Sequence, residues 1–347
     1  MQHATGSLFG LAYGDALGKP TEFQTVEQII ARYGPGGPRD LEGDPALVTD
    51  DTQMALAVAH ALHDDAALTP DELEPRLRAR FVAWWRSPDN NRAPGGTCMA
   101  ACSRLAQPGR WQHATVITSK GCGANMRVTP VGLIPGLDLD ILAGIAQLQA
   151  ALTHGHPTGL TAAELTAYAV RLLRDGADLD TLPATLRDHC ASQRRRYHHD
   201  WLGDLWSVAR ASTPEAFIAA GWDECAAAVD RLSEALIDPD RGADPCAATG
   251  AAWIAEEALA TGLYCALLFP DNPVTALARA ATSSGDSDSI ACLTGAFLGA
   301  TGGAEIWPAH WATRIEYADQ LASLGAAWDA TADTERTDRN QKQFLAP

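Results

Sequence analysis

Apolar residues recur at helical spacing along most of the chain. Alanine and leucine repeat every three or four positions in residues 54–62 and again in residues 162–173, as in a helix with one buried face. Alternating runs of β-branched residues, which would indicate strands, are almost absent. The pattern therefore predicts an all-α fold, a compact multi-helix bundle.

Clusters of proline and glycine interrupt the helical runs at residues 33–45, 88–96, 120–136 and 237–247, and we interpret them as long loops between helices. None of them has the character of a linker between domains, so we expect a single domain over residues 1–330. Residues 331–347 are polar and lack a sustained apolar face. We expect this tail to be disordered and assign it no function.

Glycine recurs at every fourth position in two segments that are far apart in the sequence. One set is Gly6, Gly10, Gly14 and Gly18, and the other is Gly295, Gly299 and Gly303. Each set would leave one helix face smooth enough for a second helix to approach closely. Similar stripes occur in membrane helices, but these segments are short and flanked by acids, which favours tight packing inside a bundle. If the two faces pack together, the acids beside them approach one another.

Composition narrows the classes of function. The 347 residues are 46% hydrophobic, which is enough for a large core, and they carry 43 acidic against 26 basic residues. The net charge of -17 argues against a surface for duplex nucleic acid, whose phosphates need clustered lysine and arginine. We expect a monomer.

The sequence also indicates the compartment. Its longest apolar stretch, residues 290–304, is shorter than the roughly 20 residues that a membrane-spanning helix needs, and no signal sequence is recognisable at the start. The eight cysteines form no CxxC pair, which is typical of buried free thiols in a reducing environment. We therefore expect a cytoplasmic protein that makes no membrane contact.

Three short acidic clusters lie at the borders of helical runs. They are Gly14–Gly18, which contains Asp15 and leads to Glu22, then Thr49–Thr52, and finally Gly285–Ser289. Taken singly, the second and third clusters read as helix caps, and Glu22 reads as a solvated surface acid. If the second and third clusters converge with Glu22, however, capping would not relieve the repulsion among these five carboxylates, and a metal site becomes the better interpretation.

Oxygen ligands are those that hard cations such as Mg²⁺ and Mn²⁺ prefer. The clusters offer enough of them for two such ions, with water and substrate completing the coordination. The candidate metal ligands are Glu22, Thr49, Asp50, Asp51, Asp286, Asp288 and Ser289.

Two further segments are candidates for binding a phosphorylated sugar. The loop from Lys120 to Arg127 is rich in glycine and ends in a cation, so that its backbone amides and Arg127 could face a diphosphate; by itself it is equally an ordinary turn. The second segment contains the two histidines His154 and His156. They could contact a sugar or phosphate, or they could simply belong to a surface loop. The candidate residues are Gly121, Gly123, Asn125, Arg127, His154 and His156.

The chain resembles the ADP-ribosylglycohydrolase family from about Thr5 to about His310. The resemblance rests on five segments that occur in the family's order: the three acidic clusters, the loop from Gly123 to Arg127 and the segment Thr153–Pro157. The resemblance implies an all-α bundle that holds two Mg²⁺ or Mn²⁺ ions through the second and third clusters, with Glu22 gating the pocket or binding metal. It also implies that the metals hold ribose hydroxyls while the glycine loop and His154 face the diphosphate and sugars.

Active members of this family hydrolyse the bond at C1″ of the distal ribose and release ADP-ribose. For this chain the resemblance implies the same reaction on an ADP-ribosylated protein or other acceptor, with arginine as the expected acceptor, and catalysis by Glu22, Asp51 and Asp288. The alternative is a catalytically retired member that binds ADP-ribose or has a structural role.

The chain departs from the family pattern at two points. Ser289 stands where many relatives have threonine, which keeps the hydroxyl but frees its rotamer. Ala93 and Pro94 stand where some relatives have an acid that serves as a candidate general base, and Asp89 is the nearest acid upstream. The sequence therefore leaves the general base unidentified.

Overall fold

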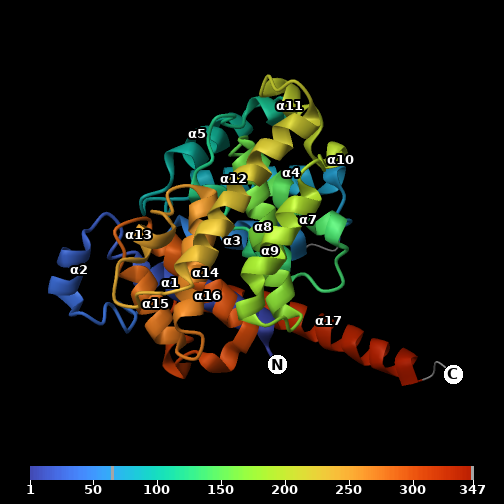
Figure 1. The fold of residues 1–347 in the computed structure, drawn as a ribbon. Coiled ribbons are helices and arrows are strands. Elements are labelled where there is room, and N and C mark those ends of the chain that lie inside the picture. The colour runs from blue at the N-terminus through green and yellow to red at the C-terminus, as the bar shows by residue number, and fades with distance from the viewer. Residues whose placement is uncertain (64–65, 345–347) are drawn as a thin grey trace.

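The computed structural model describes residues 1–63 and 66–344, and within these ranges it consists of 17 α-helices joined by loops and short 3₁₀ turns (Figure 1). Extended pairing in the described part is limited to three isolated bridges, one of which joins Gly121 to Ile254. The all-α prediction is confirmed. The two runs that it was based on lie in α3 (Asp50–His63) and α8 (Pro157–Arg174).

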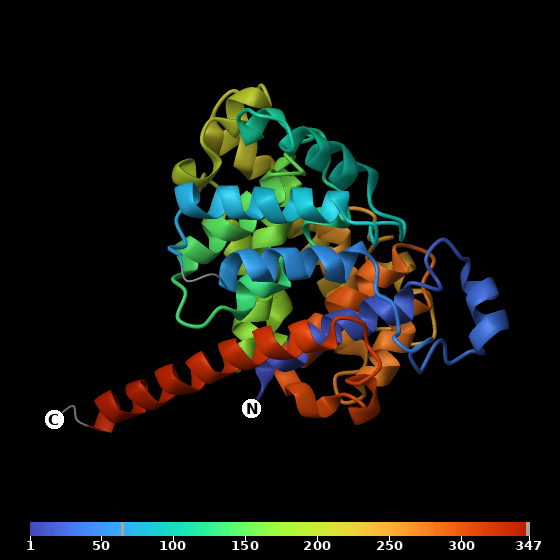
Figure 2. The same ribbon diagram turned by 180° about the vertical axis from the view of Figure 1, so that it is seen from behind.

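Two groups of helices build the bundle. In one group α1 (His3–Gly18) packs along α16 (Ser287–Gly302), and α14, α15 and α17 pack against this pair. In the other group α8 is flanked by α7 and α12. Figure 2 shows α3 and α4 crossing the back of the molecule. The remaining bounds are α4 Pro70–Arg86, α7 Leu139–Ala151, α12 Pro214–Ala235, α14 Ala255–Leu268, α15 Pro273–Ala281 and α17 Ala318–Phe344.

Shorter helices complete the described chain. They are α2 Val26–Tyr33, α5 Gly96–Leu105, α6 Thr129–Leu133, α9 Leu182–Gln193, α10 His199–Leu202, α11 Leu205–Val208 and α13 Pro245–Thr249. The segment 120–136, predicted to be a loop, contains α6 and a 3₁₀ turn at Cys122–Ala124.

The contact between α1 and α16 is made by glycine. A Cβ atom added to Gly14 would lie 1.9 Å from the carbonyl oxygen of Ala291, and one added to Gly10 would lie 2.2 Å from that of Gly295. Both distances are far below any permitted contact, so only glycine allows the two backbones to come this close. The predicted packing of the two glycine faces is confirmed.

Helix α17 reaches into the segment that the sequence predicts to be a disordered tail. Helix α17 continues through Thr331 as far as Phe344, and residues 345–347 lie outside the described part of the chain. The helix is anchored by Leu321, Leu324 and Trp328, which are buried.

Seven of the eight cysteines are buried and all eight are free, as expected from their spacing. Across the helices of the described ranges, we find none with the length and apolar character required to cross a bilayer.

Candidate metal centre and substrate pocket

The three acidic clusters meet at one end of the α1–α16 contact. Helix α1 ends at Gly18, α3 begins at Asp50 and α16 begins at Ser287. A Cβ atom on Gly18 would lie 2.3 Å from the Cα atom of Asp288, so the last glycine of the stripe sets the first turn of α16 directly against the end of α1. The glycine packing therefore determines where the carboxylates converge.

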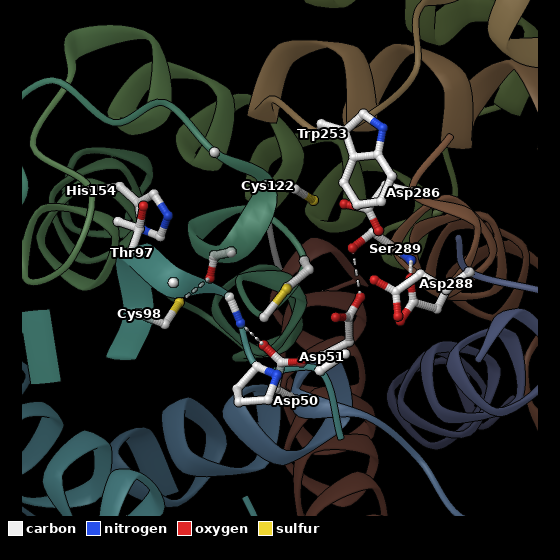
Figure 3. Close-up of a pocket in the computed structure, with 18 of the residues that line it drawn as sticks. Asp50, Asp51, Thr97, Cys98, Cys122, His154, Trp253, Asp286, Asp288 and Ser289 are labelled. Atoms are coloured by element: carbon white, nitrogen blue, oxygen red, sulfur yellow. Dashed lines mark hydrogen bonds between the residues drawn. The ribbon is translucent and has the colours of Figure 1, made fainter. Parts of the chain in front are cut away.

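The carboxylates form one wall of a pocket of about 380 Å³ (Figure 3). Oxygens of Glu22, Asp286 and Asp288 lie within 4.8 Å of one another. The Ser289 hydroxyl donates a hydrogen bond of 2.9 Å to Asp51, which ties the start of α16 to the start of α3. Asp50 accepts a hydrogen bond of 3.3 Å from the backbone amide of Gly95.

Burial and mutual repulsion make these carboxyl groups weak acids. Burial, followed by the charge of Asp288, raises the pKa of Asp50 to about 7 and that of Glu22 to about 9. The same two causes raise the pKa of Asp51 and of Asp286 well above the ordinary value. A divalent cation would remove this repulsion, so the cluster fits the metal that the sequence predicts.

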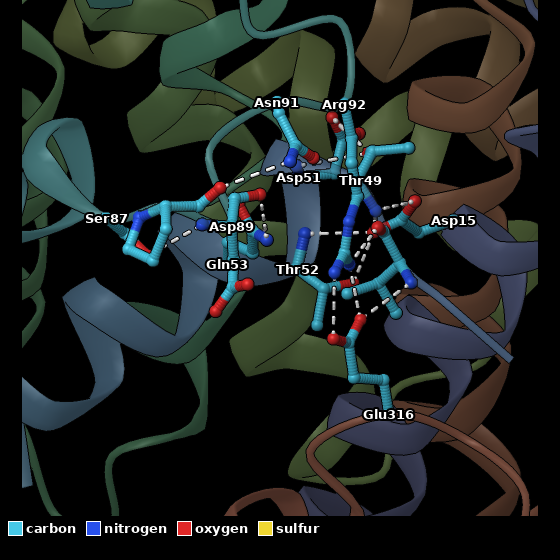
Figure 4. Close-up of polar contacts among 12 residues, drawn as sticks. Asp15, Thr49, Asp51, Thr52, Gln53, Ser87, Asp89, Asn91, Arg92 and Glu316 are labelled. Carbon is cyan, nitrogen blue, oxygen red and sulfur yellow. Dashed lines mark hydrogen bonds and ion pairs between the residues drawn. The ribbon is translucent and has the colours of Figure 1, made fainter. Parts of the chain in front are cut away.

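Asp15 lies beneath this wall and is completely buried. Its carboxylate accepts hydrogen bonds from the backbone amide of Thr49 (2.9 Å), the amide of Thr52 (3.0 Å) and the Thr52 hydroxyl (2.5 Å) (Figure 4). Asp15 thus holds the turn that presents Asp50 and Asp51. Asp15 belongs to the first acidic cluster, but the sequence analysis did not include it among the site residues. Its position inside an apolar helix was the signal that its carboxylate needs buried hydrogen-bond partners.

A second support holds the same turn from the other side. Arg92 donates a hydrogen bond of 2.8 Å to the carbonyl oxygen of Val48 and pairs with Glu316, which accepts from the Val48 amide at 3.1 Å (Figure 4). Both side chains are mostly buried. Residue 48 is therefore fixed immediately before Thr49 and the two aspartates.

The opposite wall consists of small residues and one histidine. It includes Gly95, Gly96, Thr97, Gly121 and Gly123. His154 lines the same wall (Figure 3), and burial together with the charge of Arg127 lowers its pKa to about 3, so the imidazole is neutral at physiological pH. A Cβ atom on Gly123 would lie 2.8 Å from the sulfur of Cys98, which shows how tightly this loop is packed.

Three predicted substrate-binding residues do not line the pocket. Arg127 is fully buried and donates hydrogen bonds to the Gln149 carbonyl (2.6 Å) and to the Thr153 hydroxyl (2.8 Å). Asn125 donates to the carbonyl oxygen of Ala255 at 3.0 Å, and His156 caps the start of α8. In this structure the loop folds inward and its cation is held in the protein interior, and the substrate contacts expected of these three residues stay predictions.

Thr49 is also absent from the pocket lining, and its hydroxyl lies 3.5 Å from Asp51. Glu22, Asp50, Asp51, Asp286, Asp288 and Ser289 do line it, together with Gly121, Gly123 and His154.

Two pocket residues escaped the sequence analysis. Phe23 and Trp253 lie at the rim of the pocket with their rings stacked, and both are exposed. An exposed aromatic side chain cannot be recognised from hydrophobic spacing, which predicts burial. The one signal was the position of Phe23 directly after Glu22.

Comparison with known proteins finds relatives over much of the chain. The chain is 30% identical over 205 residues to an uncharacterized protein of Archaeoglobus fulgidus, an alignment that covers 56% of this chain and 65%, or less than two thirds, of that protein. It is 26% identical over 318 residues to the ADP-ribosyl-[dinitrogen reductase] glycohydrolase of Rhodospirillum rubrum, covering 90% of each chain.

A solved structure described as an ADP-ribosylglycohydrolase-related protein complex has the same fold. It superimposes with a TM-score of 0.65 over 95% of this chain and 98% of that chain, at 21% sequence identity. The sequence model of the ADP-ribosylglycohydrolase family matches residues 1–340. The chain therefore belongs to the ADP-ribosylglycohydrolase family.

Proposed function

We propose that this protein is a metal-dependent hydrolase that releases ADP-ribose from an ADP-ribosylated protein by cleaving the glycosidic bond at C1″ of the distal ribose. The observation that carries the proposal is the convergence of carboxylates from three separate segments on one wall of a pocket whose other wall is made of glycine, threonine and a neutral histidine. Membership of the family supports the reaction class.

Two divalent cations, Mg²⁺ or Mn²⁺, are the proposed cofactors. The residues that would hold them are Glu22, Thr49, Asp50, Asp51, Asp286, Asp288 and Ser289. When bound, such ions supply positive charge that binds ribose hydroxyls and lowers the pKa of a bound water. Glu22, Asp51 and Asp288 are the proposed catalytic residues.

The Ser289 hydroxyl donates to one oxygen of Asp51 and thereby fixes the orientation of that carboxylate. Glu22 is less buried than the aspartates, its oxygen lies within 4.8 Å of those of Asp286 and Asp288, and its backbone amide donates to the Gly18 carbonyl at 3.0 Å. This position suits a group that meets the substrate as it enters.

His154 is a proposed substrate ligand. Its Nδ1 lies 2.8 Å from the Thr153 hydroxyl, which accepts a hydrogen bond from Arg127 at 2.8 Å and lies 3.4 Å from the Ala150 carbonyl oxygen. Its Nε2 lies beside the glycine loop, where a Cβ atom on Gly121 would be 3.4 Å away. The neutral imidazole therefore presents Nε2 to the substrate as its one free ring nitrogen.

A protein is the proposed acceptor because the relative from Rhodospirillum is named for a protein acceptor. This chain has more acidic than basic residues, which favours a cationic side chain as the acceptor in the substrate protein. We propose that this side chain is arginine.

The test is release of free ADP-ribose from ADP-ribosylated arginine, serine and nucleic-acid substrates with Mg²⁺, with Mn²⁺ and with a chelator. We expect release from the arginine substrate that requires metal and falls at least a hundredfold in Asp288→Asn. Asp271→Asn, which removes an exposed carboxylate that does not line the pocket, is the matched control. Metal binding without release from any substrate would instead indicate a retired ADP-ribose-binding member.

A further inference from the structure

Two aromatic side chains stand exposed at the rim of the pocket. The rings of Phe23 and Trp253 stack with their centroids 5.7 Å apart and their planes inclined by 17°. Phe23 is 70% exposed and Trp253 is 44% exposed. Large apolar side chains that remain in water at a pocket rim are typical of a binding surface.

The backbone holds both rings in place at a conformational cost. Phe23 has a φ of 63°, and Ala252, which precedes Trp253, has a φ of 65°. Residues with a Cβ atom avoid this left-handed region, and those that adopt it concentrate at functional sites. Each conformation is stabilised by its neighbours, because the carbonyl of Trp253 accepts from the Cys122 amide at 3.1 Å and the amide of Gln24 donates to Thr21 at 3.0 Å.

The ring pair lies at the carboxylate end of the pocket. Phe23 directly follows Glu22, and the amide of Asp286 donates to the carbonyl of Ala251 at 2.9 Å, two residues before Trp253. Figure 3 shows the indole of Trp253 beside Asp286, with His154 and Thr97 on the other side of the pocket. A group that stacks on these rings is therefore adjacent to the carboxylates.

We propose that Phe23 and Trp253 form the subsite for the acceptor and that they recognise the planar, positively charged guanidinium group of an arginine side chain. This inference rests on the proposed function. Guanidinium groups stack on the faces of aromatic rings, with tryptophan the preferred partner, and the acidic character of the chain adds long-range attraction for a cation.

Adenine is the other planar group in the substrate, and its position in the molecule argues against it. In the conjugate, the acceptor is bonded to C1″ of the ribose that we place at the carboxylates. Adenine is separated from that ribose by two phosphates and a second ribose. A ring pair next to the carboxylates is thus closer to the acceptor than to the base.

The experiment compares substrates that share ADP-ribose but differ in acceptor. Trp253→Leu and Phe23→Leu remove the rings, Trp253→Phe and Phe23→Tyr keep an aromatic face, and Ile237→Ala removes an exposed apolar side chain elsewhere as a matched control. For the leucine variants we expect KM for ADP-ribosylated arginine to rise about tenfold, with KM for ADP-ribosylated serine and the affinity for free ADP-ribose within twofold of wild type. The aromatic variants and the control should behave as wild type, and the melting temperature checks folding.

A second measurement does not depend on turnover. Agmatine carries the guanidinium group and the amino group of arginine without its carboxylate, and we expect calorimetry to detect its binding to wild-type protein loaded with Mg²⁺ and ADP-ribose but not to Trp253→Leu. Lack of agmatine binding to wild type would overturn the inference even if ADP-ribose is released. Failure of wild type to hydrolyse any conjugate would overturn the proposed function, and agmatine binding would then still report on the subsite.

Three other outcomes would also contradict the inference. An equal loss of affinity for free ADP-ribose would place the adenosine moiety on the rings. An equal loss with the arginine and serine substrates would give the rings a structural role. A loss confined to an ADP-ribosylated nucleobase would assign the rings to a nucleic-acid acceptor.

Discussion

At the scale of single residues, the pocket depends on side chains that do not line it. Arg127 shows this most clearly, because its guanidinium packs 4.3 Å from the ring centre of Phe81 and hydrogen bonds to Thr153, whose hydroxyl lies 2.8 Å from Nδ1 of His154. Asp15 plays the same supporting part for the aspartates at the start of α3. In both cases a buried charge positions a group that lines the pocket.

Replacing Asp15 by alanine should therefore lower the free energy of unfolding. The change leaves the amides of Thr49 and Thr52 buried without acceptors, at roughly 2–4 kcal/mol, and this exceeds the relief of repulsion from Asp288. Urea denaturation measures the effect, with Asp271→Ala as control. A variant as stable as wild type would show that Asp15 does not support the turn.

At the scale of elements, the closeness of α1 and α16 is the feature on which the site depends. The glycine stripes are visible in the sequence, and they predict that the first and third clusters converge. The sequence does not predict the inward fold of the 120–127 loop, because the spacing of glycine is the same whether the final arginine faces the pocket or the interior.

Gly14→Ala should separate the two helices. Its new methyl group would meet the Ala291 carbonyl, and such overpacking of backbone costs roughly 3 kcal/mol. We expect a lower melting temperature together with weaker metal binding, since the ligands lie at the end of this contact. Gly96→Ala is the control for stability, because a Cβ atom there meets no other atom within 4 Å. Equal stability of the two variants would contradict the packing.

Helix α17 also stabilises α1. Asp329 accepts hydrogen bonds from the amides of Ala4 (2.8 Å) and Thr5 (3.0 Å), and so it caps a helix whose own preceding residue, Gln2, makes no side-chain cap. Asp329→Ala should reduce the free energy of unfolding by about 1 kcal/mol. Chemical denaturation measures this loss, whereas Asp329→Asn, which retains an acceptor, should lose less. An unchanged midpoint in Asp329→Ala would refute the capping role.

At the scale of the whole molecule, metal binding, protonation and stability are linked. The metal-free cluster avoids repulsion by holding protons, since the pKa of Asp50 is about 7 and that of Glu22 about 9. Groups whose pKa is raised on folding contribute stability below their unfolded pKa and lose it as the pH rises through the folded value. The metal-free protein should therefore become progressively less stable as the pH rises from about 4, where these groups titrate in the unfolded chain, to about 9.

A bound divalent cation should reverse this trend, because it requires the deprotonated carboxylates. We expect affinity for Mg²⁺ or Mn²⁺ to rise with pH over the same window, and the melting temperature to rise with metal concentration. Calorimetry in buffers of different ionisation enthalpy would count the protons released. Affinity that is independent of pH from about 7 to 9 would show that the cluster does not bind the ion.

The helices, the glycine stripes and the carboxylates could be predicted from the sequence, because each depends on local spacing or residue type. The supporting contacts of Arg127 and Asp15 and the stacking of Phe23 on Trp253 could not be predicted, because these contacts join residues that only tertiary packing brings together. Hydrophobic spacing, moreover, predicts burial, and the rim rings are exposed.

The packing of α1 against α16 has a consequence for how the protein is made. Asp51 and the Ser289 hydroxyl that orients it are 238 residues apart, so one side of the site is synthesised long before the other. During that interval the glycine face of α1 lacks its partner, and contacts of such long sequence separation form slowly. A nascent chain that stops short of α16 lacks Asp286 and Asp288, so the carboxylate cluster is completed only in a late step of synthesis.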